Sequence, residues 1–451
     1  MFIRRFHLSA VLLVFAALSS FVDSYELGLR VGSSAEWCEA ETIIMHTPGQ
    51  EVFLGVIHPD AALFEKPFNV RKAQQQHLKF VEKLQNQGVR VIQLTEALMR
   101  GTVNEYTMEI MKGVRLDSLR EFTKQFLIFN TSGLSSEEAS KQQKYHDDII
   151  SKMHPEQLVQ IILQQPTVTL HSTGGFNTGY TAEYQLKPVM NMYFMRDQMI
   201  TTAKGVVLSN MNSLQRQVET KIAKFALYNF GIVPLLEITG EGHLEGGDFI
   251  PAGETSFIGQ GLRTNEIAVK EMLEKKVFGS KRVVVVKDPW KNQIQMHLDT
   301  FFNIINPHLA VLVADRLDVN VCDANNVCKI NPANPEKRLT VDVYESKEPL
   351  ADSPHAPYEK VVSDADFQEY VEKKLGFKVL PVSPENQLLY GVNFLTVKSN
   401  VLMAIDGSSQ DYKDLLAKNG VSVDWMDFSE VTGGYGAAHC TTQSISRICS
   451  P

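Results

Sequence analysis

One pattern of apolar and polar residues recurs five times along the chain. In each copy an amphipathic helical stretch ends at a glycine and is followed by a run of apolar, β-branched residues that is typical of a strand. The copies span residues 77–94, 224–238, 271–286, 367–382 and 414–426. Any alternation of helices and strands gives two or three such copies, whereas five indicate a modular α/β domain.

The helical stretch before Gly88 illustrates what this pattern predicts for packing. Its apolar positions are spaced three and four residues apart, so they share one face of the helix. The residues on that face are Ala73, His77, Phe80, Val81 and Leu84. We expect this face to pack on a sheet and the opposite face to be solvated.

The interval between the first and second copies is much longer than the others and contains several helical patterns with few strand signals. Ser135 or Ser136 is suited to cap one of these helices, with Glu137 and Glu138 in its first turn. We therefore predict an α-helical insertion over residues 104–166.

The N-terminus has the pattern of a secretory signal. Arg4 and Arg5 precede an uncharged apolar stretch from Leu8 to Val22, which is short for a bilayer crossing of about 20 residues. We interpret residues 1–24 as a signal peptide and residues 25–451 as a catalytic chain that is secreted or resides in the secretory-pathway lumen, with no membrane attachment after cleavage. An uncleaved signal anchor or a buried N-terminal helix is the alternative.

The composition is that of a folded globular protein, with 44% hydrophobic and 21% charged residues among 451. The formal net charge of −8 comes without a basic cluster. Nucleic acid is therefore not expected as a partner.

The cysteine count leaves at least one thiol unpaired, because the chain has five cysteines. Cys322 and Cys328 flank the turn-forming stretch "DANN" and could meet across a hairpin, while Cys38 and Cys449 could join the two ends of the chain. These pairings would leave Cys440 free, although a lone cysteine is more often structural than catalytic.

Four short stretches concentrate polar residues in apolar surroundings, over residues 191–198, 241–249, 296–305 and 439–442. In the third, His297 and Asp299 lie two residues apart on a predicted strand, so both side chains would face the same side. Such a pair can share an acid/base task or bind a metal, or it can form one polar edge of a half-buried strand.

The other stretches are ambiguous when taken singly. Glu245 and Asp248 enclose two glycines, which permits an unusual turn or close approach by other groups, but surface turns have the same pattern. Asp197 follows an arginine and can be a paired surface acid or a pocket residue. His439 and Cys440 are adjacent on a predicted strand and would face opposite sides, so His297 is the more natural base for Cys440.

In their order, "FMRD", "EGGD", "HLDT" and a terminal "HC", these stretches resemble the arginine deiminases, within the guanidine-group-modifying superfamily that also contains the amidinotransferases. The stretches "ETIIMHTPG", "LFEKPFN" and "GVRVIQL" extend the resemblance over nearly everything after the signal peptide. The resemblance implies a five-bladed, pseudo-symmetric α/β propeller of ββαβ modules with an inserted α-helical subdomain.

The resemblance also implies a role for individual residues. Cys440 would be the nucleophile and His297 the general acid/base, oriented by Glu245, while Asp197 and Asp299 would hold a guanidinium. The implied substrate-binding or supporting residues are Asn191, Phe194, Arg216, Arg263 and Asp248, of which the two arginines would bind the α-carboxylate.

The implied reaction is hydrolysis of free L-arginine to L-citrulline and ammonia through a thiouronium intermediate on the cysteine, with no metal and no cofactor. Tyr435 departs from the family, which often has an arginine five residues before the nucleophile, so the choice of guanidine stays open. The sequence also leaves a homo-oligomer open.

Four other functions are compatible with parts of the sequence. They are an amidinotransferase, a secreted peptidylarginine deiminase, a secreted binding protein without turnover, and a metallohydrolase built on His297, Asp299, Glu245 and Asp248.

Overall fold

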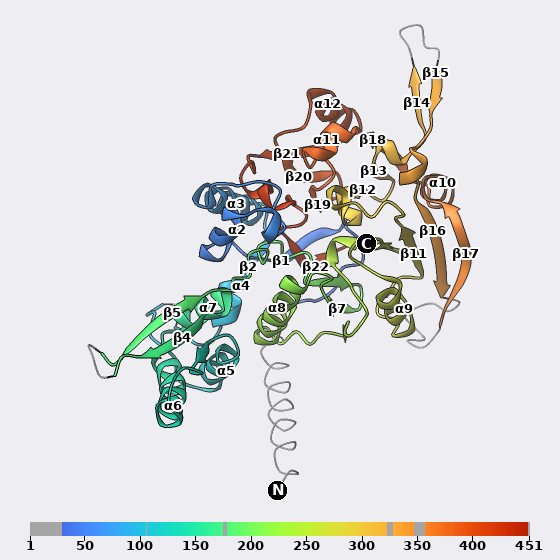
Figure 1. Cartoon of the computed structure of the whole chain (residues 1–451). Coiled ribbons are helices and arrows are strands. Elements are labelled where there is room, and N and C mark those ends of the chain that lie inside the picture. Colours follow the sequence, from blue (N-terminus) through green and yellow to red (C-terminus); the bar gives the residue numbers. More distant parts are fainter. Residues whose placement is uncertain (1–28, 105, 175–177, 323–327, 347–356, 450–451) are drawn as a thin grey trace.

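Short-stranded sheets and their connecting helices form the described part of the chain, which covers residues 29–104, 106–174, 178–322, 328–346 and 357–449 of a computed structural model (Figure 1). The fold is mixed α/β. The predicted signal peptide lies outside the described residues. Within them, no helix combines the length and the apolar character that a membrane crossing requires.

Five of the sheets contain the same unit, in which two antiparallel strands are followed by a third strand that is parallel to the second. The first three units are β22 (Gln443–Ile448), β1 (Glu39–Met45) and β2 (Arg90–Gln93); β6 (Met199–Thr202), β7 (Gly205–Leu208) and β8 (Leu236–Glu237); and β9 (Phe249–Ala252), β10 (Thr255–Gln260) and β11 (Arg282–Lys287). The other two are β12 (Phe302–Asn306), β13 (Leu309–Val313) and β18 (Lys378–Val382); and β19 (Leu395–Lys398), β20 (Val401–Ile405) and β21 (Ser422–Met426).

A helix precedes the third strand of every unit. These helices are α3 (Val70–Asn86), α8 (Gln217–Asn229), α9 (Glu266–Glu274), α10 (Phe367–Glu369) with the π-helical turn Tyr370–Lys374, and α12 (Gln410–Lys418). Each is followed by its predicted glycine, and all five glycines have φ between 71° and 84°. Only glycine adopts that left-handed backbone readily, which is why it ends the helix. The five predicted helix–glycine–strand units are confirmed.

The packing of α3 follows its apolar pattern. All five residues of the predicted face are buried, and the Phe80 ring meets the edge of Phe428 with centroids 5.3 Å apart. The first turn is capped because Asn69 accepts a hydrogen bond from the Lys72 backbone N–H.

The predicted insertion contains the expected helices α5 (Val114–Thr123), α6 (Ser136–Lys152) and α7 (Pro155–Gln164). Ser135 caps α6 in a capping box with Glu138, so the first of the two predicted caps is confirmed. These elements lie at the lower left of Figure 1, away from most of the sheets. The boundaries 104–166 of an insertion stay a prediction.

The expectation of a purely helical insertion was wrong. The segment also contains β3 (Ile128–Asn130), which pairs with β4 (Thr167–Ser172), and β4 pairs with β5 (Tyr180–Gln185). The physical reason is that a run as short as "FLIF" has no periodicity that separates a helix from a strand.

The remaining helices and strands are not part of the shared three-stranded unit. They are α2 (Phe53–Ile57), α4 (Leu94–Met99), α11 (Pro384–Leu388), β14 (Val319–Cys322), β15 (Cys328–Asn331), β16 (Thr340–Ser346) and β17 (Tyr358–Asp366). Strands β16 and β17 extend the third unit, and β14 and β15 form a hairpin at the top right of Figure 1. Cys328 is disulfide-bonded and lies opposite Cys322 in the register of this hairpin, while the Cys322 side chain is outside the described residues. The pairing of these two cysteines therefore stays a prediction.

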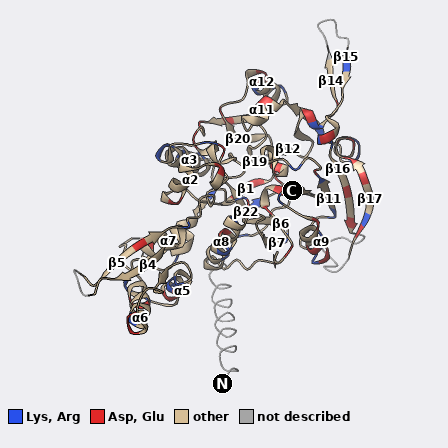
Figure 2. Ribbon diagram, in the orientation of Figure 1, with Lys and Arg blue, Asp and Glu red and all other residues tan. Residues whose placement is uncertain are grey.

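The two ends of the chain meet in one sheet. Strand β22 lies antiparallel to β1, and a disulfide joins Cys38 to Cys449 across a sequence separation of 411 residues. This predicted pairing is confirmed, and Cys440 has a free, buried thiol. Figure 2 shows Lys and Arg interspersed with Asp and Glu along the ribbon.

We expect Cys449→Ser to lower the midpoint of thermal unfolding, because the Cys38–Cys449 bond restricts the unfolded chain and such bonds typically contribute about 2–4 kcal/mol. Calorimetry of the wild type and of both single serine variants measures this effect. The double variant should be no less stable than either single one, since all three break the same bond. Equal midpoints for all four proteins would contradict the prediction.

Candidate active site

Several of the predicted catalytic and binding residues lie in loops just before the first strands of the repeating units. Asp197 precedes β6, Asp248 precedes β9, Asp299 precedes β12 and Cys440 precedes β22. The corresponding loop before β19 carries Asn393, which the sequence did not single out. Equivalent loops of a repeated unit lie at the same end of their sheets, so they bring together residues that are far apart in sequence.

Hydrogen bonds between these loops confirm that they meet. The Arg196 backbone N–H donates to the Cys440 carbonyl (3.1 Å), and the Gly246 N–H donates to the Asp197 carbonyl (3.1 Å). The Asn393 amide donates to the Asp299 carbonyl (3.1 Å). Asp197, Glu245, His297, Asp299 and Cys440 are each at most 3% exposed.

Cys440 is held between an amide and a carboxylate. Its Sγ lies 3.1 Å from Asn393 Nδ2 and 3.6 Å from Asp299 Oδ2. Burial, together with the carboxylates of Asp299 and Asp197, raises the pKa of the Cys440 thiol well above its usual value. These surroundings favour the neutral thiol, and additional positive charge beside Sγ would favour the thiolate.

His297 lies between two carboxylates. Its Nε2 donates to Glu245 Oε2 (2.8 Å), and its Nδ1 is 3.8 Å from Asp197 Oδ1. Burial opposes the imidazolium, but Asp197, the hydrogen bond to Glu245 and the charge of Asp248 outweigh it and raise the pKa of His297 to about 9. The ring is thus a proton donor at neutral pH, oriented by Glu245.

The local structure around His297 and Cys440 differs from the expected strands. His297 caps a 3-10 turn, Leu298–Thr300, which contains Asp299 and precedes β12. His439 and Cys440 lie in a turn before β22. The strand prediction was wrong because the apolar pattern begins at the strand and does not mark the polar turn before it. The inference that His439 is not the base for Cys440 agrees with its hydrogen bonds to other residues.

The two glycines of "EGGD" are required by close approach, as expected. A Cβ on Gly247 would lie 2.6 Å from His297 Nδ1, and a Cβ on Gly246 would collide with the Arg196 carbonyl oxygen. Any larger residue would push the imidazole from its position between Glu245 and Asp197.

Arg216 binds two buried acids of its own chain. Its Nη1 donates to Asp197 Oδ2 (2.8 Å) and its Nη2 donates to Glu219 Oε2 (2.9 Å). Glu219 also accepts from Gln198 Nε2 (2.7 Å). Burial opposes the cation, but Glu219 and Asp197 outweigh it and raise the pKa of Arg216. The guanidinium of Arg216 thus occupies one oxygen of an acid predicted to hold the substrate's guanidinium.

Asp299 is positioned by a histidine that is itself held by a buried acid. His439 Nδ1 lies 2.7 Å from Asp299 Oδ2, and its Nε2 lies 3.1 Å from Glu36 Oε1. Burial raises the pKa of Asp299, but the hydrogen bond and charge of His439 outweigh it and lower that pKa. Arg447 Nη2 donates to Glu36 Oε1 (2.7 Å). The series of bonded side chains from Asp299 through His439 and Glu36 therefore ends at Arg447 on β22.

The predicted binding residues surround this centre. Asp248 Oδ1 accepts from the Leu298 N–H (2.9 Å), and burial raises the pKa of Asp248 to about 6. Arg263 Nη2 donates to Gln293 Oε1 (2.8 Å), and its Nη1 lies 3.9 Å from Glu245 Oε1.

Asn191 and Phe194 take different positions around the site. Asn191 Nδ2 donates to the Ala62 carbonyl (2.8 Å), while Phe194 lines the cavity beside Cys440. A Cβ on Gly436 would collide with the Phe194 ring, so a small residue is needed at this position before Cys440.

The cavity at the centre is small. It encloses about 20 Å³ and is lined by Leu63, Phe194, Asp197, Arg216, Arg263, Gln293, Met296, His297, Gly434, Tyr435 and Cys440. This is room for one water-sized molecule, so any guanidino compound requires side chains to move. Tyr435 adopts a left-handed backbone (φ 68°) and also lines a neighbouring cavity of about 130 Å³ with Asn393.

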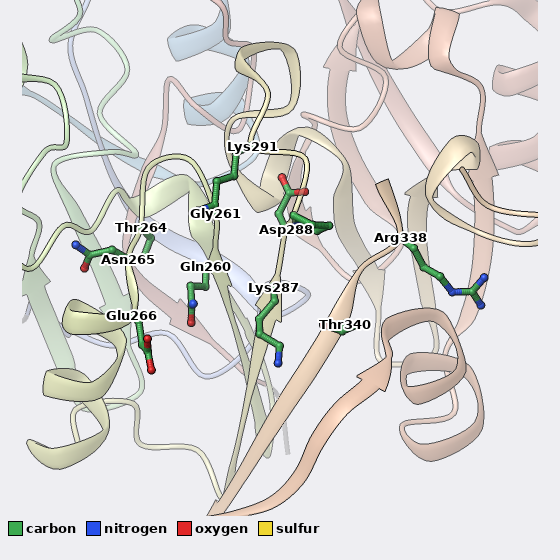
Figure 3. Close-up of a pocket in the computed structure, with 11 residues that line it drawn as sticks. Gln260, Gly261, Thr264, Asn265, Glu266, Lys287, Asp288, Lys291, Arg338 and Thr340 are labelled. Carbon is green, nitrogen blue, oxygen red and sulfur yellow. The ribbon is translucent and has the colours of Figure 1, made fainter. Parts of the chain in front are cut away.

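A larger cavity of about 500 Å³ has a separate lining, although one of its residues, Thr264, accepts a hydrogen bond from the Glu245 N–H (3.2 Å). Figure 3 shows side chains from the ends of β10 and β11 and the start of β16 around it. Two of its three cations are in ion pairs, Lys287 with Asp342 and Arg338 with Asp366; the third is Lys291. None of the predicted site residues lines it.

One group of site residues has donors suited to a metal ion. Asp197, Glu245 and His297 each offer a ligand atom, all within 4.8 Å of one another. A metal on His297 Nε2 would have to displace its hydrogen bond to Glu245.

Sequence reasoning missed several residues of this site: Glu36, Glu219, Asn393 and Arg447. The three charged residues have patterns typical of solvated surface. Asn393 had a detectable signal, because it precedes the first strand of the one repeating unit that lacked a candidate.

Comparison with known proteins shows the family to which the chain belongs. The family model described as arginine deiminase matches residues 60–447. The chain is 25% identical to the arginine deiminase of Halobacterium salinarum (strain ATCC 29341 / DSM 671 / R1), covering 94% of this chain and 98% of that protein. It is 24% identical to the arginine deiminase of Metamycoplasma hominis, covering 95% and 98%.

A solved structure of a mutant of AgrE in binary complex with L-arginine has a TM-score of 0.51 and 13% identity, covering 90% of this chain and 40% of that one. At this identity the likeness concerns the fold alone. The family model, by contrast, covers most of the chain. The chain belongs to the arginine deiminase family.

Proposed function

We propose that this chain hydrolyses free L-arginine to L-citrulline and ammonia through a covalent intermediate on Cys440. One observation carries the proposal. Asp197 Oδ1 and Asp299 Oδ1 are buried without a hydrogen-bond partner among the described residues, in the same centre as Cys440 and His297. Buried carboxylate oxygens need a donor, and a guanidinium offers planar, charge-assisted donors to two carboxylates at once.

The first step is binding of the guanidinium between Asp197 and Asp299. The central carbon is then fixed beside Sγ, since Asp299 Oδ2 is 3.6 Å from that atom. The bound cation offsets the two carboxylates that hold the thiol neutral, so the pKa of Cys440 falls on binding.

The second step is attack of the thiolate on the guanidinium carbon, which forms an S–C bond and a tetrahedral adduct. His297 transfers its proton to one amino nitrogen, the C–N bond breaks and ammonia leaves. The product is a thiouronium on Cys440 that still carries the rest of the amino acid.

The third step is hydrolysis. Water gives a proton to the now neutral His297 and attacks the same carbon, and collapse of this adduct breaks the S–C bond. The hydroxyl proton of the adduct passes to solvent as citrulline leaves, and the thiolate and imidazolium are restored, so the sum is argininium plus water to citrulline plus ammonium.

Arginine cannot enter a cavity of about 20 Å³ without rearrangement. We propose that the substrate's guanidinium replaces Arg216 on Asp197. Arg216, still paired with Glu219, then turns towards the substrate's α-carboxylate together with Arg263. This exchange reconciles the observed ion pair with the predicted role of Arg216.

We also propose that the five repeating units form a five-bladed propeller, which the equivalent positions of their site loops support. Export is a further proposal, supported by the signal-like N-terminus and the Cys38–Cys449 disulfide, because disulfides persist in oxidising compartments. N-terminal sequencing of the protein recovered from the medium tests export.

Product assays under three conditions separate the enzymatic alternatives. Arginine is supplied with and without glycine, and ammonia, citrulline and ornithine are measured. Ornithine formed only with glycine indicates an amidinotransferase, and turnover of a blocked arginyl peptide but not of arginine indicates a peptidylarginine deiminase. Turnover that a chelator abolishes indicates a metallohydrolase.

We expect Cys440→Ser to abolish citrulline formation, because a serine hydroxyl is a far weaker nucleophile without a strong base. The fold should persist, since the change keeps the shape of the side chain. Citrulline and ammonia assays with circular dichroism measure both. Wild-type turnover by this variant would refute the nucleophile assignment.

We expect Glu245→Gln to move the alkaline limb of kcat/KM to lower pH. The wild-type limb should lie near pH 9, since His297 must be protonated to release ammonia and loses its proton as pH rises through a pKa of about 9. Removing the carboxylate at 2.8 Å lowers that pKa by about one unit or more. The exposed, lysine-paired Glu266→Gln is the matched control. An unchanged limb in Glu245→Gln would argue against His297 as the acid.

We expect Arg263→Ala to raise KM for arginine by about 10-fold or more, because a charge-assisted contact contributes about 1.5–3 kcal/mol. Agmatine, which lacks the α-carboxylate, should be affected less. Steady-state kinetics with both substrates give the ratio, and Arg282→Ala, which removes a half-buried arginine paired with Glu345, is the control. Equal losses for both substrates would exclude carboxylate binding by Arg263.

A further inference from the structure

We infer that Asn393 is a further catalytic residue, which donates a hydrogen bond from Nδ2 to the Cys440 thiolate and holds the nucleophile loop with its remaining polar atoms. This inference rests on the proposed function, in which Cys440 is the nucleophile.

The position of Asn393 in the fold is the first reason. It lies two residues before β19, in the loop that corresponds to the loops of Asp197, Asp248, Asp299 and Cys440. Four repeating units supply a reactive or binding side chain from this position, and Asn393 is the contribution of the fifth. It is 1% exposed, in a region where an asparagine needs partners for every polar atom.

Apart from its backbone N–H, which donates to the Tyr390 carbonyl (3.1 Å), Asn393 makes its hydrogen bonds to the catalytic loops. Oδ1 accepts from the backbone N–H groups of Ala437 (3.1 Å) and Cys440 (3.2 Å), and the main-chain carbonyl accepts from the His439 N–H (3.1 Å). Nδ2 donates to the Asp299 carbonyl (3.1 Å) and lies 3.1 Å from Cys440 Sγ.

These contacts also fix the orientation of the amide. Within the Asn393 side chain, only the carbonyl oxygen can accept hydrogen bonds from two backbone N–H groups. That oxygen therefore faces the loop of Ala437 and Cys440, and the NH₂ group faces Sγ. Asn303 keeps the segment in place, because its Nδ2 donates to the carbonyls on either side, those of Val392 (2.9 Å) and Phe394 (2.9 Å).

An N–H donor to sulfur strengthens when the thiol ionises, because the acceptor becomes an anion. The other titratable or charged groups around Cys440 are Asp197, Asp299, His297, His439, Arg216, Arg263, Tyr193, Tyr390 and Tyr435. The two carboxylates disfavour the thiolate. The hydrogen bond from Asn393 Nδ2 stabilises the thiolate before attack, and again when the thiolate leaves the carbon that becomes the citrulline carbonyl.

The experiment measures the pH dependence of Cys440 alkylation by iodoacetamide, read by peptide mass, together with citrulline formation. The variants are Asn393→Asp, which keeps the acceptor for Ala437 and Cys440 but replaces the donor, and Asn393→Leu, which removes the donor without adding charge. Asn229→Asp is the matched control, since Asn229 is also buried and donates to two backbone carbonyls, those of Ala97 and Leu98.

Both Asn393 variants should raise the alkylation midpoint by about one pH unit or more and lower kcat by about 10-fold or more, while Asn229→Asp leaves the midpoint unchanged. A merely structural role predicts loss of activity without a shift of the midpoint, and that result in either folded variant overturns the proposal. If Asn393→Asp does not fold, Asn393→Leu decides. The wild type could make no citrulline while the Asn393 variants still shift the alkylation midpoint. That result would refute the proposed function but leave the hydrogen bond from Asn393 to the Cys440 thiolate supported.

Discussion

Buried negative charge is the constraint on which the centre of this molecule depends. Asp197, Glu245 and Asp299 are almost completely buried within one group of loops. Unpaired buried carboxylates are expensive, so each is matched by a cation or a hydrogen-bond donor. Arg216 matches Asp197, His297 matches Glu245, and His439 matches Asp299. Two oxygens of these three acids, Asp197 Oδ1 and Asp299 Oδ1, have no hydrogen-bond partner among the described residues, which is the basis for proposing that a cation rich in donors binds there.

The same charge explains how the nucleophile is controlled. The carboxylates that would bind a guanidinium also raise the pKa of the Cys440 thiol, and Arg216 is paired with one of them. In the mechanism that we propose, substrate binding and nucleophile activation are therefore the same event. The repeating fold supplies the geometry, because each unit contributes one loop, and the Cys38–Cys449 disulfide fixes the sheet in which the nucleophile loop ends.

Much of this could be predicted from sequence because the signals were local. The helix–glycine–strand units, the Ser135 cap and the apolar face of α3 follow from residue spacing, whereas the Cys38–Cys449 pair, 411 residues apart, was only one possibility until the fold placed the two ends side by side. The polar turns at His297 and Cys440 could not be predicted, since their shape depends on contacts with other loops. Glu36 and Glu219 have surface-like sequences, and only the fold brings Arg447 and Arg216 to them. Asn393 is an ordinary residue before an apolar strand until the five loops are compared.

The central claim is that Cys440 becomes covalently bound to the whole amino acid after ammonia has left. Peptide mass analysis of acid-quenched turnover with ¹⁵N-guanidino-labelled arginine tests it most directly. The account predicts that the peptide containing Cys440 gains the mass of arginine minus ammonia and retains two of the labelled guanidino nitrogens, one of them bonded to the side chain. A gain of the amidino group alone, with release of ornithine, or no adduct on Cys440 during turnover, would contradict it.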